Sequence, residues 1–186
     1  MSSLTSVVRI LEILAKDLNC PKTTSCGRLF DAVAAMSGGC QVIGYEAQAA
    51  IEFMVAGGSA EALPFEFGLR PGGDRLIMEV APIFHGVVAA LKHEEGLALI
   101  SRRFPRPLVL LLTEVASRAR QATGLNTVAL SGGVFQNQVL FPPLLAELDR
   151  AGFQILTHAL LPCGDGCLSL GQAVIGRDAL LRRILT

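Results

Sequence analysis

The chain lacks an excess of charge of either sign, a long apolar run and an even set of cysteines. Its 16 Lys and Arg residues balance 16 Asp and Glu residues, which argues against a nucleic-acid surface. Apolar runs are short, as in residues 108–112, and fall far below the length needed to cross a bilayer. Five cysteines cannot all pair, which argues against a disulfide scaffold. We therefore expect a cytoplasmic protein that binds neither nucleic acid nor membrane.

Apolar residues, by contrast, are abundant. Hydrophobic residues make up 51% of the sequence and charged residues 17%, and the mean hydropathy is +0.50. A small chain of this composition is expected to leave an apolar face uncovered once its own core is filled. Such a face predicts contact with a missing part of a larger protein or with further copies of the chain, as in a homo-oligomer.

Apolar spacing divides the chain into a helical part and an alternating part. Residues 1–126 are predicted to form helices and one hairpin, which spans 63–80 and turns at 71–74. Residues 127–186 are predicted to form a strand, a helix, a strand and a helix, with the strands at 127–130 and 153–157. A right-handed crossover would make these strands parallel. We predict a single α/β domain over residues 1–186.

The helix boundaries follow from caps and breakers. Prolines at 105 and 107 are expected to separate a short segment from a long helix that starts at 108, and the helix ending at 150 is expected to bend or restart at 142–143. The other helices are expected at 1–20, 25–39, 44–58, 82–93 and from 168 onward.

Two glycine-rich loops follow the two predicted parallel strands, "SGGVFQN" over residues 131–137 and "PCGDGC" over residues 162–167. Ligands of open α/β sheets bind beyond the carboxyl ends of the strands, so both loops are expected at one cleft. Glycine there would admit a phosphate or a ribose to the backbone. The loops match neither a Walker A loop, nor a G-x-G-x-x-G pattern, nor a G-x-S-x-G nucleophile elbow. From these residues alone, two interpretations of the loops stay open, a tight turn and a ligand-binding loop.

Three further interpretations stay open at this level. Cys163, Cys167 and His158 could be zinc ligands, although small loop residues are the favoured reading. Asp31 could face a cleft or face solvent on its helix. Asp165 could bind a metal ion or simply occupy a Gly-Asp-Gly turn.

Four ordered motifs carry a family resemblance: "TTSCGRLFDAVAA", "YEAQAAIE", "VALSGGVFQN" and "PCGDGCLSLGQA". From residue 23 to about residue 176, the chain resembles the C-terminal part of the HypF-type carbamoyltransferases of [NiFe] hydrogenase maturation. It is more distantly similar to O-carbamoyltransferases and to tRNA threonylcarbamoyladenosine synthases. The resemblance implies one lobe of an actin/Hsp70-like ATPase fold, helix-rich with a small mixed sheet, whose nucleotide-binding part would be residues 127–186.

The resemblance also implies a chemistry. A carbamoyl group would pass from carbamoyl-adenylate to the C-terminal cysteine of a HypE-like acceptor. The implied cofactors are ATP or carbamoyl-adenylate and a divalent metal ion, iron or zinc. Two alternatives are a carbamoyltransferase with a different acceptor and a non-catalytic nucleotide-binding or scaffolding relative.

Individual residues acquire roles from the same resemblance. Backbone N–H groups at Gly132 and Gly133 would contact the adenylate, and Asn137 would bond to its ribose or base. Asp165 matches the family's metal-binding aspartate. No catalytic residue is assigned. The full set implied to bind the nucleotide is Gly27, Asp31, Ser131, Gly132, Gly133 and Asn137, with Gly27 and Asp31 on the opposite wall.

The chain departs from the family pattern in several respects, among them Gly164-Asp165-Gly166-Cys167 where the family often reads Asn-Asp-Gly-Gly and Phe104-Pro105 where it reads Phe-His. Family members usually have Gly where this chain has Ala47, which adds a methyl group near the expected ribose. The histidines that complete the family's metal site belong to a preceding segment that we expect to lie outside this chain. We therefore expect the isolated chain to be half of a site, active only when the missing N-terminal half of the domain is supplied.

Overall fold

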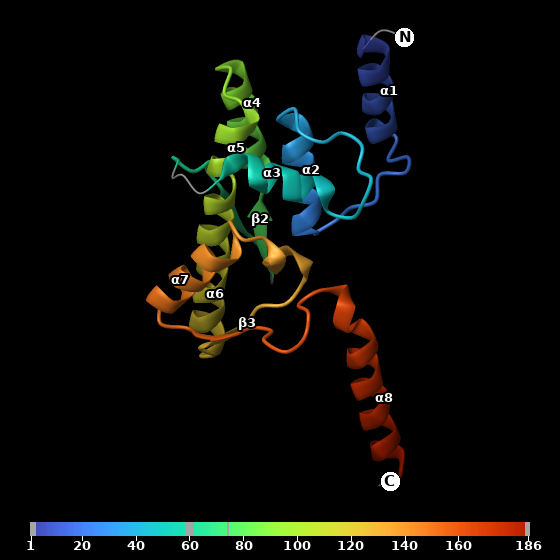
Figure 1. Ribbon diagram of the computed structural model, residues 1–186, viewed down its shortest axis with the longest axis vertical. Helices are drawn as coiled ribbons and strands as arrows, with labels where there is room; N and C mark the ends of the chain where they lie inside the picture. Colours follow the sequence, from blue (N-terminus) through green and yellow to red (C-terminus); the bar gives the residue numbers. More distant parts are fainter. Residues whose placement is uncertain (1–2, 59–61, 74, 185–186) are drawn as a thin grey trace.

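The computed structural model describes residues 3–58, 62–73 and 75–184. A body of packed helices carries a terminal helix at each end, and these two helices project from it in opposite directions (Figure 1). The projecting helices are α1 (Ser3–Ala15) and α8 (Leu168–Ile184). None of the described helices is both long enough and apolar enough to cross a membrane.

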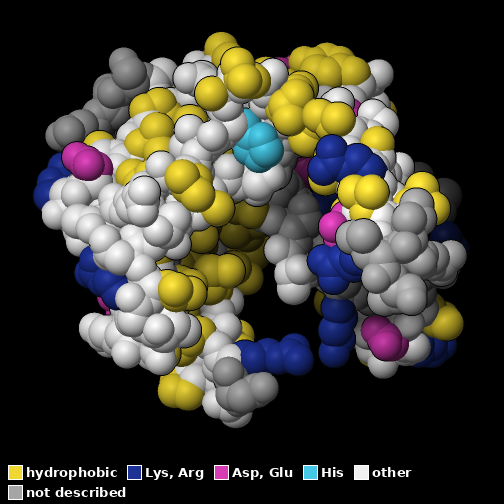
Figure 2. All heavy atoms as spheres, turned by 90° about the horizontal axis from the view of Figure 1, so that it is seen from below, with side chains coloured by type: hydrophobic (Ala, Val, Ile, Leu, Met, Phe, Trp, Pro, Cys, Tyr) yellow, Lys and Arg dark blue, Asp and Glu magenta, His cyan; other side chains and the backbone are white. Residues whose placement is uncertain are grey.

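Both projecting helices leave apolar side chains uncovered. Leu11 of α1 is 58% exposed and Ile175 of α8 is 71% exposed. Seen from below the view of Figure 1, hydrophobic side chains are spread over the surface and gather in the central hollow (Figure 2). The uncovered apolar surface predicted from composition is therefore confirmed. Other large apolar side chains exposed on these helices are Val8, Ile10, Ile13, Leu14, Leu168, Leu170, Val174, Leu180 and Leu181.

The helical body is held by three phenylalanine rings. Phe30 and Phe53 each meet Phe104 edge to face, with ring centroids 4.7 Å and 5.8 Å away, and all three side chains are buried. This geometry adds a quadrupole attraction to the area that the rings bury. The rings join several helices of the body, which comprises α2 (Cys26–Met36), α3 (Gln48–Gly57), α4 (Ala81–Lys92), α5 (Leu97–Arg103) and α6 (Pro105–Thr123).

The helices expected at 25–39, 44–58 and 82–93 are confirmed by α2, α3 and α4. The expected start of the long helix at residue 108 is wrong, because α6 begins at Pro105. Proline suits the first helical turn, whose N–H groups have no intrahelical acceptor. Pro105 and Pro107 are both buried there, so packing favours the earlier start.

Two strands, β1 (Gly68–Gly72) and β2 (Arg75–Glu79), pair antiparallel as the predicted hairpin. The predicted first strand is too long, because residues 62–67 are not in a strand. Phe65 is 3% exposed, and the Arg103 guanidinium lies 4.3 Å from its ring centroid. Phe65 thus packs against the helical body instead of forming part of the predicted strand. The last residue of the predicted turn, Asp74, lies outside the described residues.

The C-terminal part contains the predicted parallel pair. Strands β3 (Thr127–Ala129) and β4 (Gln154–Leu156) run parallel and are joined through α7 (Phe141–Arg150). Helix α7 packs beside α6 (Figure 1). Its first turn contains the two prolines at which the sequence predicted that a helix bends or restarts. Among the described strands, β3 pairs with β4 alone, so the other edge of β3 is open. Short 3-10 helices, η1 (Gly133–Gln136) and η2 (Asp165–Cys167), follow the strands.

Candidate functional site

A cleft of about 790 Å³ lies between the start of α2, the start of α3 and the loops that follow β3 and β4. Four segments that are distant in the sequence therefore meet around it. Ser131 is not found among the described residues that line the cleft. The sequence-predicted residues that do line it are Gly27, Asp31, Gly132, Gly133, Asn137 and Asp165.

The first wall of the cleft is the N-terminal turn of α2. The Ser25 hydroxyl caps the helix by accepting a hydrogen bond from the Arg28 N–H at 3.4 Å. One turn later, the Arg28 guanidinium donates to the Asp31 carboxylate at 3.1 Å. The Asp31 side chain is 28% exposed and lines the cleft. The structure thus places Asp31 on the cleft side of its helix, and its role towards a nucleotide stays a prediction.

The second wall is the start of α3. Ala47 precedes this helix with φ 61° and ψ 11°, a left-handed conformation that costs an L-residue roughly 1–2 kcal/mol. The Gln48 side chain holds the turn, because its Oε1 accepts from the Gly44 N–H at 2.6 Å. Ala47 and Glu46 both line the cleft. Glycine would suit this backbone, whereas the alanine is strained.

The third wall joins the two strand-exit loops. Gly132 has φ 120° and ψ 152°, a conformation essentially restricted to glycine. Its N–H donates to the Cys163 carbonyl at 2.6 Å. The loops touch again further along, since a Cβ built on Gly164 would lie 3.4 Å from the Gly133 Cα. At Gly132, glycine is therefore required by the backbone conformation, independently of any ligand.

Asn137 is partly committed to the fold. Its Oδ1 accepts hydrogen bonds from the Val139 N–H at 3.0 Å and from the Leu140 N–H at 3.1 Å, just before α7 begins. The side-chain acceptor is thus used for capping. Towards a ligand in the cleft, Asn137 can serve as a donor through its Nδ2.

Burial controls the thiol of Cys26, which also lines the cleft. Burial raises the pKa of this thiol to about 11, because a thiolate is poorly solvated there. The group therefore stays protonated at neutral pH and is a poor nucleophile. Sequence reasoning missed both Cys26 and Glu46 as cleft residues, although each lies inside a quoted motif, "TTSCGRLFD" or "YEAQAA".

Metal donors are not assembled in the part of the chain that the structure describes. Within that part, no three His, Cys, Asp or Glu side chains converge closely enough to hold an ion. Asp165 is exposed at the start of η2, and Cys163 and Cys167 are free. The described residues thus do not fit a complete metal site.

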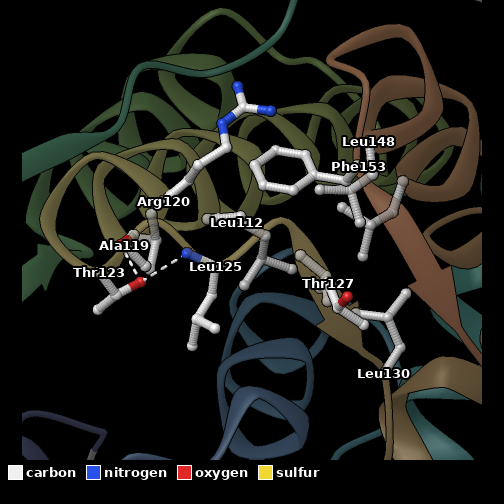
Figure 3. A pocket seen from close by; sticks show the side chains of 13 residues that line it. Leu112, Ala119, Arg120, Thr123, Leu125, Thr127, Leu130, Leu148 and Phe153 are labelled. Atoms are coloured by element: carbon white, nitrogen blue, oxygen red, sulfur yellow. Dashed lines mark hydrogen bonds between the residues drawn. The ribbon is translucent and has the colours of Figure 1, made fainter.

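A second cavity, the α6 groove, is apolar and holds about 360 Å³. Leucine, valine and alanine side chains of α6, α7 and β3 line it, and Arg120 lies over Phe153 on one side (Figure 3). The guanidinium is 4.1 Å from the ring centroid and donates to the Asn126 Oδ1 and the Ala151 carbonyl, both at 3.0 Å. Ligand pockets usually add convergent polar groups to an apolar lining. Sequence reasoning did not find this apolar groove.

Helices packed beside a short parallel pair, with a glycine-rich loop after each strand and a cleft at the strand ends, define an α/β ligand-binding lobe. Residues 3–172 match the family described as the second subdomain of the carbamoyltransferase Kae1-like domain. The chain therefore belongs to the HypF-like carbamoyltransferase family.

Individual relatives agree with this family. The probable carbamoyltransferase HypF of Methanocaldococcus jannaschii is 29% identical over 90% of the chain, and a HypF homolog of Cupriavidus necator is 34% identical over 88%. The chain spans 22% and 43% of their respective lengths.

Solved structures agree in fold. A crystal structure of full-length HypF in its phosphate- and nucleotide-bound form superposes with a TM-score of 0.87 and 32% identity, covering 97% of this chain and 24% of that one. HypF of T. kodakarensis has a TM-score of 0.77 at 24% identity, with 92% of this chain and 22% of that chain covered. The expected helix-rich lobe of an actin/Hsp70-like fold is confirmed, and the described strands form two separate two-stranded sheets, one antiparallel and one parallel.

Proposed function

We propose that this chain supplies one half of the nucleotide site of a HypF-type carbamoyltransferase, with a HypE-like protein cysteine as the carbamoyl acceptor. The observation that carries the proposal is the cleft at the strand ends, lined by six of the seven residues selected from the sequence. A similar HypF has been solved with phosphate and nucleotide bound. We assign ATP or carbamoyl-adenylate to the cleft of this chain.

The cleft suits an adenylate electrostatically and sterically. The N-terminal turn of α2 carries a partial positive charge, which favours a phosphate, whereas the charge of Arg28 is paired with Asp31. At Gly133, a built Cβ would meet no atom within 4 Å, so the space beside that backbone is open to a ligand. Asn137 donates to the ribose or base in this arrangement.

Asp165 is proposed as one carboxylate ligand of an iron or zinc ion. Because the described residues do not assemble a full donor set, the remaining ligands come from outside them. A single carboxylate holds a divalent ion weakly. Purified alone, the chain should hold metal substoichiometrically.

The α6 groove, the open edge of β3 and the apolar faces of α1 and α8 are proposed to pack against the rest of a HypF-length protein. The chain spans only 22% of the M. jannaschii relative, so much polypeptide exists there to cover them. Residues 1–186 act as one domain in this proposal, with a helical and hairpin part up to 126 and a nucleotide-binding part after it. Self-association through the same surfaces is the competing outcome. The five free cysteines suit a reducing, cytoplasmic setting.

Two observations favour a second function, that of a non-catalytic nucleotide-binding or scaffolding relative. The cleft-lining thiol of Cys26 is held protonated, and the described residues do not assemble a metal site. On this alternative, nucleotide binding persists without any carbamoyl transfer.

A reconstitution experiment separates the two. Carbamoyl-adenylate and a cysteine-tailed acceptor are incubated with the chain alone, with the preceding HypF segment alone, and with both, and the added carbamoyl mass is measured on the acceptor. We expect carbamoyl transfer only in the mixture, because groups from both halves of the site must be positioned together in the transition state. Nucleotide binding without transfer in the mixture would favour the scaffolding alternative. Turnover by the chain alone would overturn the half-site account.

A further inference from the structure

Ser131 and His158 lie opposite each other at the carboxyl ends of the parallel strands. The pairing register aligns Ala129 of β3 with Leu156 of β4, so the residues two positions further on, Ser131 and His158, are brought together. The His158 Nε2 lies 2.9 Å from the Ser131 Oγ. Neither residue is among the described residues that line the cleft, although both begin loops that do.

The loops that start at this pair are joined a second time within the next few residues. The Gly132 N–H donates to the Cys163 carbonyl at 2.6 Å, and the Ser131 Oγ lies 3.5 Å from the same carbonyl oxygen. Gly164 then packs against Gly133. The wall of the cleft formed by Gly132 and Gly133 is therefore fixed through contacts with the other loop.

The Ser131 hydroxyl can serve both neighbours because it donates once and accepts. If the His158 Nε2 is unprotonated, the hydroxyl donates to it. If the Nε2 carries a proton, it donates to the hydroxyl, whose own hydrogen can then turn towards the Cys163 carbonyl. Either tautomer of the ring keeps the contact between the loops.

We propose that His158 is a positioning residue that, through Ser131, holds the Gly132–Gly133 backbone in its ligand-receiving conformation. Ser131, expected from the family resemblance to touch the nucleotide, acts in this account through its side-chain contact with His158. The consequence for ATP rests on the function proposed above, whereas the loop contact does not.

The test compares His158→Ala with a matched control, His93→Ala. His93 is exposed at the end of α4, away from both loops. In calorimetry, ATP should bind about 3- to 10-fold more weakly to His158→Ala, the cost of one modest hydrogen bond, and unchanged to His93→Ala. His158→Gln should recover part of the loss, because its terminal amide can reach the same hydroxyl. Adding Ser131→Ala to His158→Ala should cause little further loss.

Amide hydrogen exchange without nucleotide reads the loop contact directly. Residues 131–137 and 163–167 should exchange faster in His158→Ala than in the parent chain or in His93→Ala, with the thermal midpoint little changed. Unchanged exchange, additive losses in the double variant, or faster exchange with unaltered ATP affinity would each overturn the positioning role. If the parent chain binds no ATP, the proposed nucleotide site is wrong. Amide exchange of the two loops in His158→Ala still tests the loop contact: faster exchange supports it and unchanged exchange contradicts it.

Discussion

The cleft and the α6 groove lie on the same small chain but are lined by different chemistry. The cleft gathers charged and amide side chains, among them Arg28, Asp31 and Glu46, around glycine backbone. The groove presents leucine, valine and alanine side chains, with Arg120 held over a ring. A polar ligand needs fixed donors and acceptors, whereas an apolar groove mainly buries area. This contrast is the reason for proposing that the cleft binds a nucleotide and that the groove packs against protein.

The largest effect is expected from removing the ring shared by the whole body. Phe104→Ala should lower the free energy of unfolding by about 3–5 kcal/mol, because it deletes a fully buried aromatic side chain and leaves a cavity. Denaturant unfolding measures this loss, and ATP affinity should fall with it because α2 loses its support. Leu63→Ala, at a side chain 82% exposed, is the control. Equal stability of the two variants would contradict the described core.

Arg120→Ala should separate the groove from the cleft. It removes a cation–π contact and two hydrogen bonds, for an expected loss of about 1–3 kcal/mol in unfolding free energy. ATP affinity should not change, because Arg120 does not line the cleft. Arg118→Ala, which breaks only an exposed pair with Glu114, should cost much less. A selective loss of ATP binding in Arg120→Ala would mean that the two cavities are coupled.

Ala47→Gly should relieve backbone strain beside the cleft and stabilise the fold slightly. Glycine relieves the left-handed strain but loses more entropy on folding, so the net gain in unfolding free energy is expected to be about 0.5–1 kcal/mol. The matched substitution inside the same helix, Ala56→Gly, should instead destabilise by about 1 kcal/mol. Thermal melts of the two variants should therefore shift in opposite directions. A loss in both would show that position 47 is not strained.

The smallest effect concerns Glu147 of α7, which pairs with Arg150 on the same helix and with Arg106 of α6. A hydrogen bond from Arg150, with further attraction from Arg106, holds the pKa of Glu147 below its ordinary value. Because the folded-state pKa is depressed, the stabilisation is present above the unfolded pKa and is lost as the pH falls through the folded one. Solvent screening keeps it within about 1 kcal/mol.

Glu147→Gln should therefore reduce stability at pH 7 slightly and have no effect at pH 2–3 in denaturant unfolding. ATP affinity at pH 7 should stay the same, because Glu147 does not line the cleft. Asp149→Asn, on the same helix, is the control. A loss that is larger in acid than at neutral pH would reverse the sign expected here.

Local patterns were enough to predict much of this chain. The parallel strands, the hairpin and most helices follow from apolar spacing and from glycine and proline positions. The cleft was also predictable, because loops after parallel strands must meet at one edge. The family resemblance then identified Gly27 on the far wall, which no local pattern could relate to Gly133.

What escaped prediction depends on tertiary contacts. Phe65 leaves its strand pattern because Arg103 and the helical body bury it. The Asn137 side chain accepts hydrogen bonds from backbone N–H groups just before α7, and the Ser131 hydroxyl contacts His158. Residue spacing in the sequence cannot reveal either contact. The α6 groove combines residues from α6, β3 and the segment before β4, and its apolar positions look like ordinary core positions in the sequence.

The most direct test of the nucleotide assignment is calorimetry of ATP binding to Gly133→Val beside Gly96→Val. A Cβ at either glycine would meet no atom within 4 Å, and neither backbone has a left-handed φ, so both variants should fold. Of these two glycines, only Gly133 lines the cleft. We predict that ATP binds to the parent and to Gly96→Val with equal affinity and that binding to Gly133→Val is lost. Equal affinity in all three proteins would contradict the account, because the ligand would then lie elsewhere.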